Sequence, residues 1–160
     1  MKVAAAAVIS LCLFLAWRAY RSTDEQVIRQ RLEALTVEIN SKVNDGLGTV
    51  ARAADIGSYF TDDVVVDLGE GAAPIVGRTT LVGTTSRLER RTAAFRLRLD
   101  DIGVRIEPGG TSAAVTLTAS FVQRAADAGE SMDAREFDLA MNKVSGVWRI
   151  VRVTGVDTLK

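Results

Sequence analysis

Residues 95–106, which read FRLRLDDIGVRI, decide the fold of this chain. Apolar side chains alternate with polar ones on both sides of Asp100–Asp101, and the phase of the alternation changes at that pair. The apolar positions are Phe95, Leu97, Leu99, Ile102, Val104 and Ile106. A period of two is typical of a strand with one buried face, and a change of phase inside it predicts a β-bulge. The stretch therefore predicts a long strand with one irregularity.

Three later segments repeat this alternation. They cover residues 113–123, 132–143 and 147–156, and short turns at 108–110, 127–129 and 145–146 separate the four strands. Strands that follow one another through short Gly-containing turns pair as antiparallel neighbours. The last third of the chain therefore predicts a four-stranded antiparallel meander.

The segment before the meander changes from a helical to a strand pattern. An apolar stripe with spacings of three and four predicts a helix over residues 24–44, and its members are Ile28, Leu32, Leu35, Ile39 and Val43. A second helix is predicted at 47–56, with Leu47, Val50 and Ala54 inward. A β-branched strand is predicted at 64–67 and a further helix at 79–91. Helices followed by a sheet indicate the α+β class.

The first residues form an apolar leader. Residues 3–17, VAAAAVISLCLFLAW, carry no charge, and their length of fifteen lies between a signal-peptide core and a spanning helix. No A-x-A-like cleavage site follows, and Trp17 and Tyr20 suit a membrane interface. We expect a signal-anchor or transmembrane segment at 1–21 and a folded domain at 22–160. This places the domain outside the cytoplasm on the cytoplasmic (inner) membrane of a bacterium; the alternative is cleavage and a secreted or periplasmic product.

The composition limits the chemistry. The chain has no histidine, and its one cysteine, Cys12, is in the leader. Ser-His-Asp and Cys-His catalysis and His-ligated zinc are therefore excluded, and we expect no metal and no cofactor. The twenty basic residues balance the twenty acidic ones, so no net field favours nucleic acid.

Three motifs resemble the nuclear transport factor 2-like superfamily, which includes SnoaL-like and ketosteroid isomerase-like proteins. They are residues 59–67 (YFTDDVVVD), residues 75–78 (IVGR) and residues 147–150 (VWRI). The resemblance covers about residues 24–156. It implies a cone, in which two to three helices pack on a curved antiparallel sheet and a cavity opens at the wide end. The superfamily holds enzymes, transport factors and envelope assembly proteins, so it implies little about chemistry.

The isomerase site of that superfamily is not present as a motif. The position of its carboxylate base falls on Leu68, one residue after Asp67, and residues 24–44 contain no tyrosine for the oxyanion site. Glu136 and Asp138 are the nearest candidates for its second carboxyl group. Asp67, Glu136 and Asp138 therefore stay as weak catalytic candidates. Asp67 has a structural alternative, since a turn carboxylate commonly binds backbone amides.

Four other residues are candidates for lining a pocket: Tyr59, Arg96, Arg98 and Trp148. Glu136 and Asp138 flank the apolar Phe137, so two arrangements stay open. On a concave face, both carboxylates would line the pocket with the two arginines; on a solvated face, they would form cross-strand charge pairs. Tyr59 and Trp148 have the alternative of packing in the core or at its rim.

These observations predict a membrane-tethered, extracytoplasmic module that binds a ligand or assists protein assembly, without evident catalytic machinery. Its expected partners are a small apolar ligand or an envelope protein, with a homodimer as a further expectation. The alternative is a small-molecule isomerase, cyclase or dehydratase that uses a pocket carboxylate. A buried carboxyl beside a tyrosine or a second carboxyl would favour the enzyme, and an interior filled by Phe, Leu and Trp would favour the module.

Overall fold

The computed structural model describes residues 24–41, 46–69, 71–89, 95–125 and 129–156. A first helix covers residues 24–40. The elements after it are α2 (Gly46–Gly57), β1 (Phe60–Asp67), β2 (Ile75–Val76), α3 (Arg78–Glu89), β3 (Phe95–Ile106), β4 (Ser112–Ala125), β5 (Gly129–Val144) and β6 (Val147–Gly155). The predicted helices and strands are thus confirmed in type and order, and the α+β class with them. Val43, the last residue of the stripe predicted for the first helix, lies outside the described residues.

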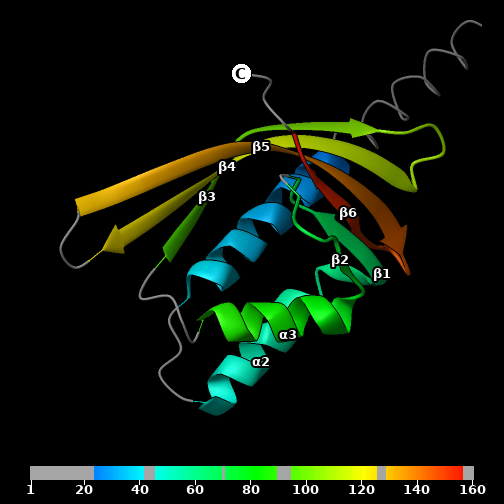
Figure 1. Ribbon diagram of the computed structural model, residues 1–160. Coiled ribbons are helices and arrows are strands. Elements are labelled where there is room, and N and C mark those ends of the chain that lie inside the picture. The colour runs from blue at the N-terminus through cyan, green and yellow to red at the C-terminus, as the bar shows by residue number, and fades with distance from the viewer. Residues whose placement is uncertain (1–23, 42–45, 70, 90–94, 126–128, 157–160) are drawn as a thin grey trace, which may run out of the picture.

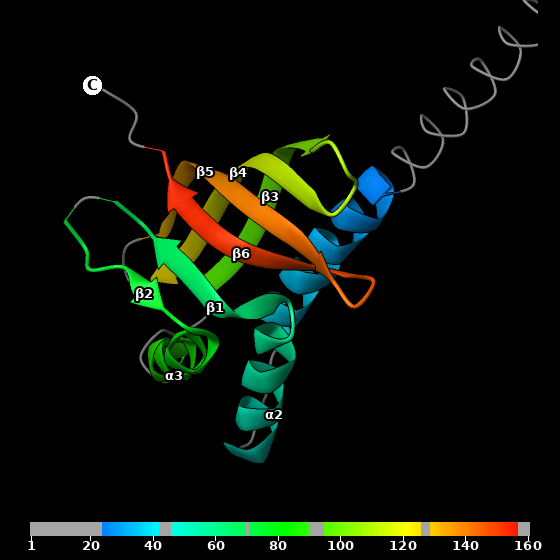
Figure 2. The ribbon, with the colours of Figure 1, turned by 90° about the vertical axis from the view of Figure 1, so that its right-hand side faces the viewer.

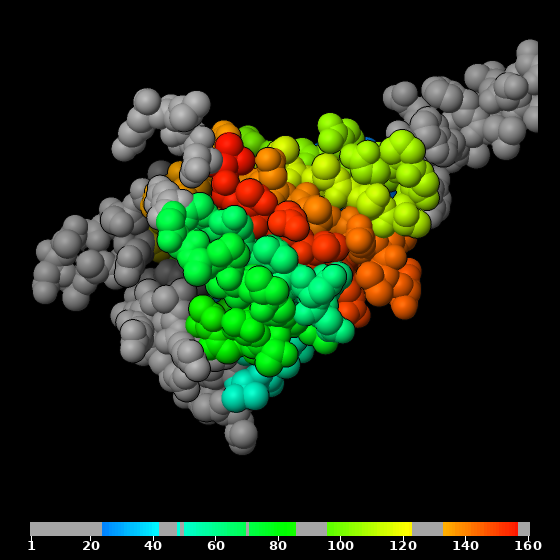
Figure 3. Space-filling view, turned by 45° about the vertical axis from the view of Figure 1, so that its right-hand side comes forward, coloured from blue at the N-terminus to red at the C-terminus, as the bar shows by residue number. Residues whose placement is uncertain are grey.

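All six strands belong to one curved sheet with the order β2-β1-β6-β5-β4-β3. The meander β3 to β6 is antiparallel, as predicted, and β1 pairs with β2 in the same way. The sheet is mixed, because β1 runs parallel to β6 with Phe60 opposite Ile150. Figure 2 shows these two strands side by side, and in the space-filling view β6 lies between β1 and β5 (Figure 3). The first and last strands therefore meet at the centre of the sheet.

The predicted bulge lies in β3. Its pairing with β4 shifts between Asp100 and Gly103, and Asp101 has a φ of 53°. A Cβ on Gly103 would lie 2.7 Å from the side-chain oxygen of Thr116, so a larger residue would require that threonine to move. The bulge bends β3 and restores its apolar residues to the inner face of the sheet.

The sheet curls over the first helix, and α2 and α3 lie below it (Figure 1). The helix contributes Ile28, Leu32 and Leu35 to the core, as its predicted stripe requires. The buried sheet residues that meet it include Val64, Val66, Val115, Leu117, Phe137, Leu139, Met141, Trp148 and Ile150. We call this helix-facing side of the sheet the inner face, and the opposite side the outer face.

The prediction for the inward side of α2 was wrong at Val50 and Ala54, and the side chain of Leu47 lies outside the described part of the chain. Val50 is 67% exposed and Ala54 is exposed, whereas Arg52, Ala53 and Ile56 are buried. The helix packs on α3, and a Cβ on Gly57 would come within 2.9 Å of Val82 there. Alanine and glycine occupy half of its twelve positions, so few large apolar residues mark the buried side in its sequence.

Polar side chains of the first helix bind the main chain of β3. Asn40 donates through Nδ2 to the Leu97 carbonyl at 2.7 Å, and its Oδ1 accepts from the Leu97 amide at 2.8 Å. Arg29, about three turns earlier in the helix, donates to the Ile102 carbonyl. The helix is thereby fixed along the strand at two points.

Replacing Asn40 with Ala is expected to reduce the free energy of unfolding by about 1–3 kcal/mol, because both main-chain groups of Leu97 lose their partner. Thermal unfolding of the full-length chain measures the loss. Asn142→Ala, at an exposed asparagine on β5, is the control and should leave the melting temperature almost unchanged. Equal melting temperatures for Asn40→Ala and the wild type would contradict this role.

The leader at residues 3–17 lies outside the described residues, as does most of the predicted segment 1–21 with it. Within the ranges that the structure describes, no helix is long and apolar enough to cross a membrane. The tether therefore stays a prediction from the sequence.

Candidate functional site

One end of the inner face is closed by a buried ion pair. Asp24, at the start of the first helix, accepts through Oδ1 from Lys143 Nζ at 2.8 Å and from Trp148 Nε1 at 3.1 Å. Lys143 and Trp148 are opposite each other on β5 and β6, and the ammonium lies 5.5 Å from the centroid of the indole ring. We call these three residues the closed end. Their charges compensate each other inside the fold, so the group holds the helix to the hairpin of β5 and β6.

Exposure rises along the strands away from the closed end. On β4, the inward residues Val115, Leu117 and Ala119 are 1%, 5% and 4% exposed, whereas Phe121, the next inward residue, is 36% exposed. Leu97 and Leu99 on β3, which are opposite Phe121 and Ala119, are half-buried. The interior is thus filled with side chains at one end and accessible at the other.

Two charged residues of β5 lie on the inner face at its accessible end. Side chains alternate along a strand, so Asp133 and Arg135 point to the same side as the buried Phe137. Asp133 is opposite Phe121, and Arg135 is opposite Ala119. The Nε of Arg135 lies 3.5 Å from a carboxylate oxygen of Asp133. We call Leu97, Leu99, Phe121, Asp133 and Arg135 the open end.

The open end combines an apolar lining with one cation. The Arg135 side chain is 38% exposed, and its guanidinium is long enough to lie over apolar neighbours while its donors reach solvent. Planar guanidinium groups donate two parallel hydrogen bonds to oxygen acceptors. The chemistry available at the open end is therefore apolar contact with a molecule that carries an oxygen atom at one end.

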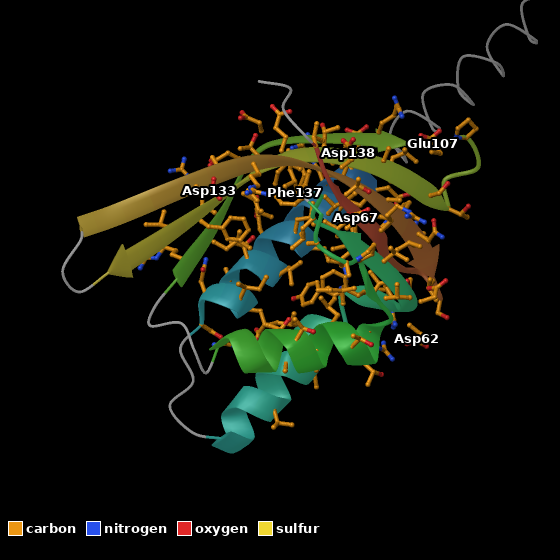
Figure 4. The ribbon with its side chains drawn as sticks, viewed as in Figure 1. Asp62, Asp67, Glu107, Asp133, Phe137 and Asp138 are labelled. Carbon is orange, nitrogen blue, oxygen red and sulfur yellow. The ribbon has the colours of Figure 1, made fainter. Side chains whose placement is uncertain are left out.

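The structure places four predicted residues on the outer face. Arg96, Arg98, Glu136 and Asp138 are all exposed, and Figure 4 shows Phe137 and Asp138 on opposite sides of the sheet. Arg98 forms an ion pair with Asp100 on its own strand at 2.9 Å. These four residues are not brought together with the inward side chains of the open end.

The remaining predicted residues lie in three different places. Asp67 is the last residue of β1 (Figure 4), and its Oδ1 accepts from the Gly69 amide at 3.0 Å. This is the contact with a turn amide that was the structural alternative for Asp67. Trp148 is fully buried at the closed end. Tyr59 is half-buried in the turn before β1, under the guanidinium of Arg31. None of these three residues belongs to the open end.

Sequence reasoning missed Asp24, Lys143, Asp133 and Arg135. Asp24 stands in a typical capping sequence, so its burial against β5 and β6 had no local signal. Asp133 and Arg135 precede Phe137 by four and two residues, and extending the strand alternation back from Phe137 would have placed both inward. In the described part of the chain, no group of three His, Cys, Asp or Glu residues could hold a metal ion.

Comparison with known proteins identifies the type of domain. The model of the SnoaL-like domain matches residues 49–154. No curated protein sequence matches the chain.

Solved structures share the fold at low sequence identity. A proposed scytalone dehydratase from Novosphingobium aromaticivorans superposes with a TM-score of 0.73 at 12% identity, over 89% of each chain. An NTF2-like protein with a cystatin-like fold from the same organism gives 0.68 at 16%, over 88% of this chain and 86% of that one. A Mycobacterium tuberculosis protein of unknown function gives 0.64 at 22%, over 86% and 76%. At these identities the likeness shows the fold alone.

Proposed function

This chain belongs to the SnoaL-like domain family, and on that premise we propose that it binds a small, largely apolar molecule at the open end of its inner face. The observation that carries the proposal is the rise in exposure along β4, from 1% at Val115 to 36% at Phe121. Apolar side chains that are half-exposed at the rim of a packed core gain free energy when a ligand removes them from water. Ligand sites of this kind are mostly apolar with a few polar groups.

Arg135 supplies the polar contact in this proposal. Its guanidinium stands one residue pair further inward than Asp133, at the boundary between the buried core and the accessible rim. A carbonyl, hydroxyl or carboxylate oxygen on the ligand would accept from it, and the apolar body would lie along Leu97, Leu99 and Phe121. The ligand class is therefore a compact hydrocarbon skeleton with one oxygen function.

The positions of the inner-face carboxylates favour binding without an acid–base step. Asp24 and Asp133 are the carboxylates of the closed end and the open end. Asp24 is held by Lys143 and Trp148, and Asp133 is 67% exposed and paired with Arg135. A carboxylate base that works near neutral pH needs a raised pKa, which requires burial without a cationic partner. Neither carboxylate meets that requirement.

One observation favours the competing function, an isomerase, cyclase or dehydratase. The first of the structures compared above is described as a proposed scytalone dehydratase. In such an enzyme, Asp133 would be the inner-face carboxylate nearest a ligand at the open end, ahead of Asp67, Glu136 and Asp138. The enzyme would be favoured if the protein converts a bound ligand chemically and Asp133→Asn abolishes that conversion.

Binding can be tested with N-phenyl-1-naphthylamine, a neutral apolar probe whose fluorescence rises on burial. We expect Phe121→Glu to weaken binding to the full-length chain in nanodiscs about tenfold or more, since a charge at the rim must be desolvated. Val37→Glu, at a 69% exposed valine on the first helix, is the matched control and should bind like the wild type. Equal probe signals for all three chains would overturn the proposal.

We also propose that the leader tethers the domain to the outer face of the cytoplasmic membrane. The support is the uncharged run at residues 3–17 with Trp17 and Tyr20 after it. Held there, the open end would meet a ligand or an envelope protein at the membrane surface. Cell fractionation with a reporter fused to the C-terminus tests the tether, and a reporter that is active only in the soluble cytoplasmic fraction would overturn it.

A further inference from the structure

Two arginines lie near Tyr59, at the junction between α2 and β1. Arg31, on the first helix, donates through Nη2 to the Ser58 carbonyl at 3.2 Å. The next carbonyl along the chain, that of Tyr59, accepts from the Ile150 amide of β6 at 2.9 Å. The segment 58–59 thus lies between the first helix and β6, and Arg149 precedes Ile150. We call Arg31, Tyr59 and Arg149 the arginine cluster.

The electrostatics of the arginine cluster are unfavourable without a further partner. The guanidinium carbon of Arg31 lies 4.7 Å from the centroid of the Tyr59 ring. Burial lowers the pKa of Arg31; the Tyr59 phenol opposes this effect, and the charge of Arg149 lowers the pKa further. Two cations therefore repel each other in a partly desolvated place, where such repulsion is stronger than in water.

The hydrogen bonding of the arginine cluster is also incomplete. The Nε atoms of Arg31 and Arg149 are both buried, and neither has a hydrogen-bond partner among the described residues. The ion pairs of the described residues are formed by other side chains, such as Arg78 with Asp62. Most buried donors in folded proteins are satisfied, and an unsatisfied buried donor on a charged group is costly. Two such donors in one region indicate an acceptor that the described part of the chain does not supply.

We propose that the arginine cluster binds an oxyanion, namely a phosphate or carboxylate group. Guanidinium forks match the oxygens of both groups, and the charge of the anion would offset the repulsion between Arg31 and Arg149. All three side chains are half-buried, so an anion can approach the cluster from solvent, and the side chains would have to shift for it to reach the two buried Nε–H groups. The cluster shares no residue with the open end, and its occupancy does not depend on the ligand proposed there.

The test is thermal unfolding of the full-length chain in a phosphate-free buffer, with sodium phosphate added against sodium chloride of the same ionic strength. Phosphate should raise the melting temperature of the wild type more than chloride does, because it binds the folded state. Arg149→Met should abolish this difference and weaken phosphate binding about tenfold or more. Without phosphate, the same variant should melt at the wild-type temperature or above it, since the repulsion and one buried donor are gone. Arg105→Met, at a 78% exposed side chain on β3, is the control and should keep the full phosphate effect.

A second readout separates binding from a structural role. Phosphate should shift the NMR signals of the Arg31 and Arg149 Nε–H groups, assigned with the single variants, and leave that of Arg105 in place. Acetate shows whether a carboxylate suffices, and vesicles of phosphatidylcholine with and without phosphatidylglycerol show whether a lipid phosphate is the source. Equal effects of phosphate and chloride on the wild type, or a phosphate effect that survives in Arg149→Met, would overturn the proposal. N-phenyl-1-naphthylamine is neutral and does not compete with phosphate for the arginine cluster. Its binding therefore tests the open end whether or not the cluster binds an anion.

Discussion

Replacing Asp24 with Ala is expected to lower the free energy of unfolding by about 3–5 kcal/mol. Asp24 is 5% exposed and accepts from both Lys143 and Trp148. Without its carboxylate, the largely buried Lys143 ammonium loses the charge that it binds in the first helix, and the indole N–H loses its acceptor. Breaking a buried ion pair from one side is costly because the remaining charge is not compensated.

Equilibrium urea unfolding of the full-length chain, followed by tryptophan fluorescence, measures this loss. Asp62→Ala is the matched control, because it removes one carboxylate from the surface pair with Arg78, and Asp62 is 82% exposed. That variant should lose less than about 1 kcal/mol. The double variant Asp24→Leu with Lys143→Met removes both charges and should recover part of the stability. A loss for Asp24→Ala no larger than that for Asp62→Ala would show that the closed end does not hold the fold.

Leu32→Ala is expected to cost about 2–5 kcal/mol, and Leu97→Ala less than about half as much. Leu32 is 1% exposed in the middle of the core, so its truncation leaves a cavity between the first helix and the sheet. Leu97 is half-buried at the open end, where water already reaches part of its surface. The same chemical change therefore removes different amounts of buried surface at the two positions.

Urea unfolding of both variants gives the two losses, and probe binding gives their functional counterpart. Leu97→Ala should weaken the binding of N-phenyl-1-naphthylamine, while Leu32→Ala should leave it largely intact under conditions in which that variant is folded. Equal losses of stability at the two sites would mean that the interior is packed alike throughout and has no open end for a ligand.

Most of the fold could be predicted because strand alternation and turn glycines are local signals. The meander from β3 to β6, its bulge at Asp100–Asp101 and the helix-facing stripe from Ile28 to Ile39 were all evident in the sequence. The parallel pairing of β1 with β6 was not, since Phe60 and Ile150 are far apart along the chain and carry no mark of the direction in which they pair. The prediction of the buried side of α2 failed because the small residues of this helix do not form a clear apolar stripe.

The site was harder to predict than the fold. Glu136 and Asp138 were candidates because they are the nearest match to the second carboxyl group of the isomerases. Both flank Phe137, and alternation places them on the face opposite to it. Asp133 and Arg135 alternate in phase with Phe137, which places them on the inner face. Charged residues are usually exposed to solvent, so their residue type did not indicate that position. Asp24 and Lys143 are separated by 119 positions, so their pairing is a property of the tertiary structure alone.

The contacts of Asn40 and Arg29 with β3 have a consequence for self-association. β3 is an edge strand of twelve residues, and free main-chain groups on such an edge can pair with a strand from another chain. The amide and carbonyl of Leu97 and the carbonyl of Ile102 are already bonded to the first helix. Strand addition along β3 would have to displace those side chains, so the helix that fills the cone also protects its longer edge against aggregation.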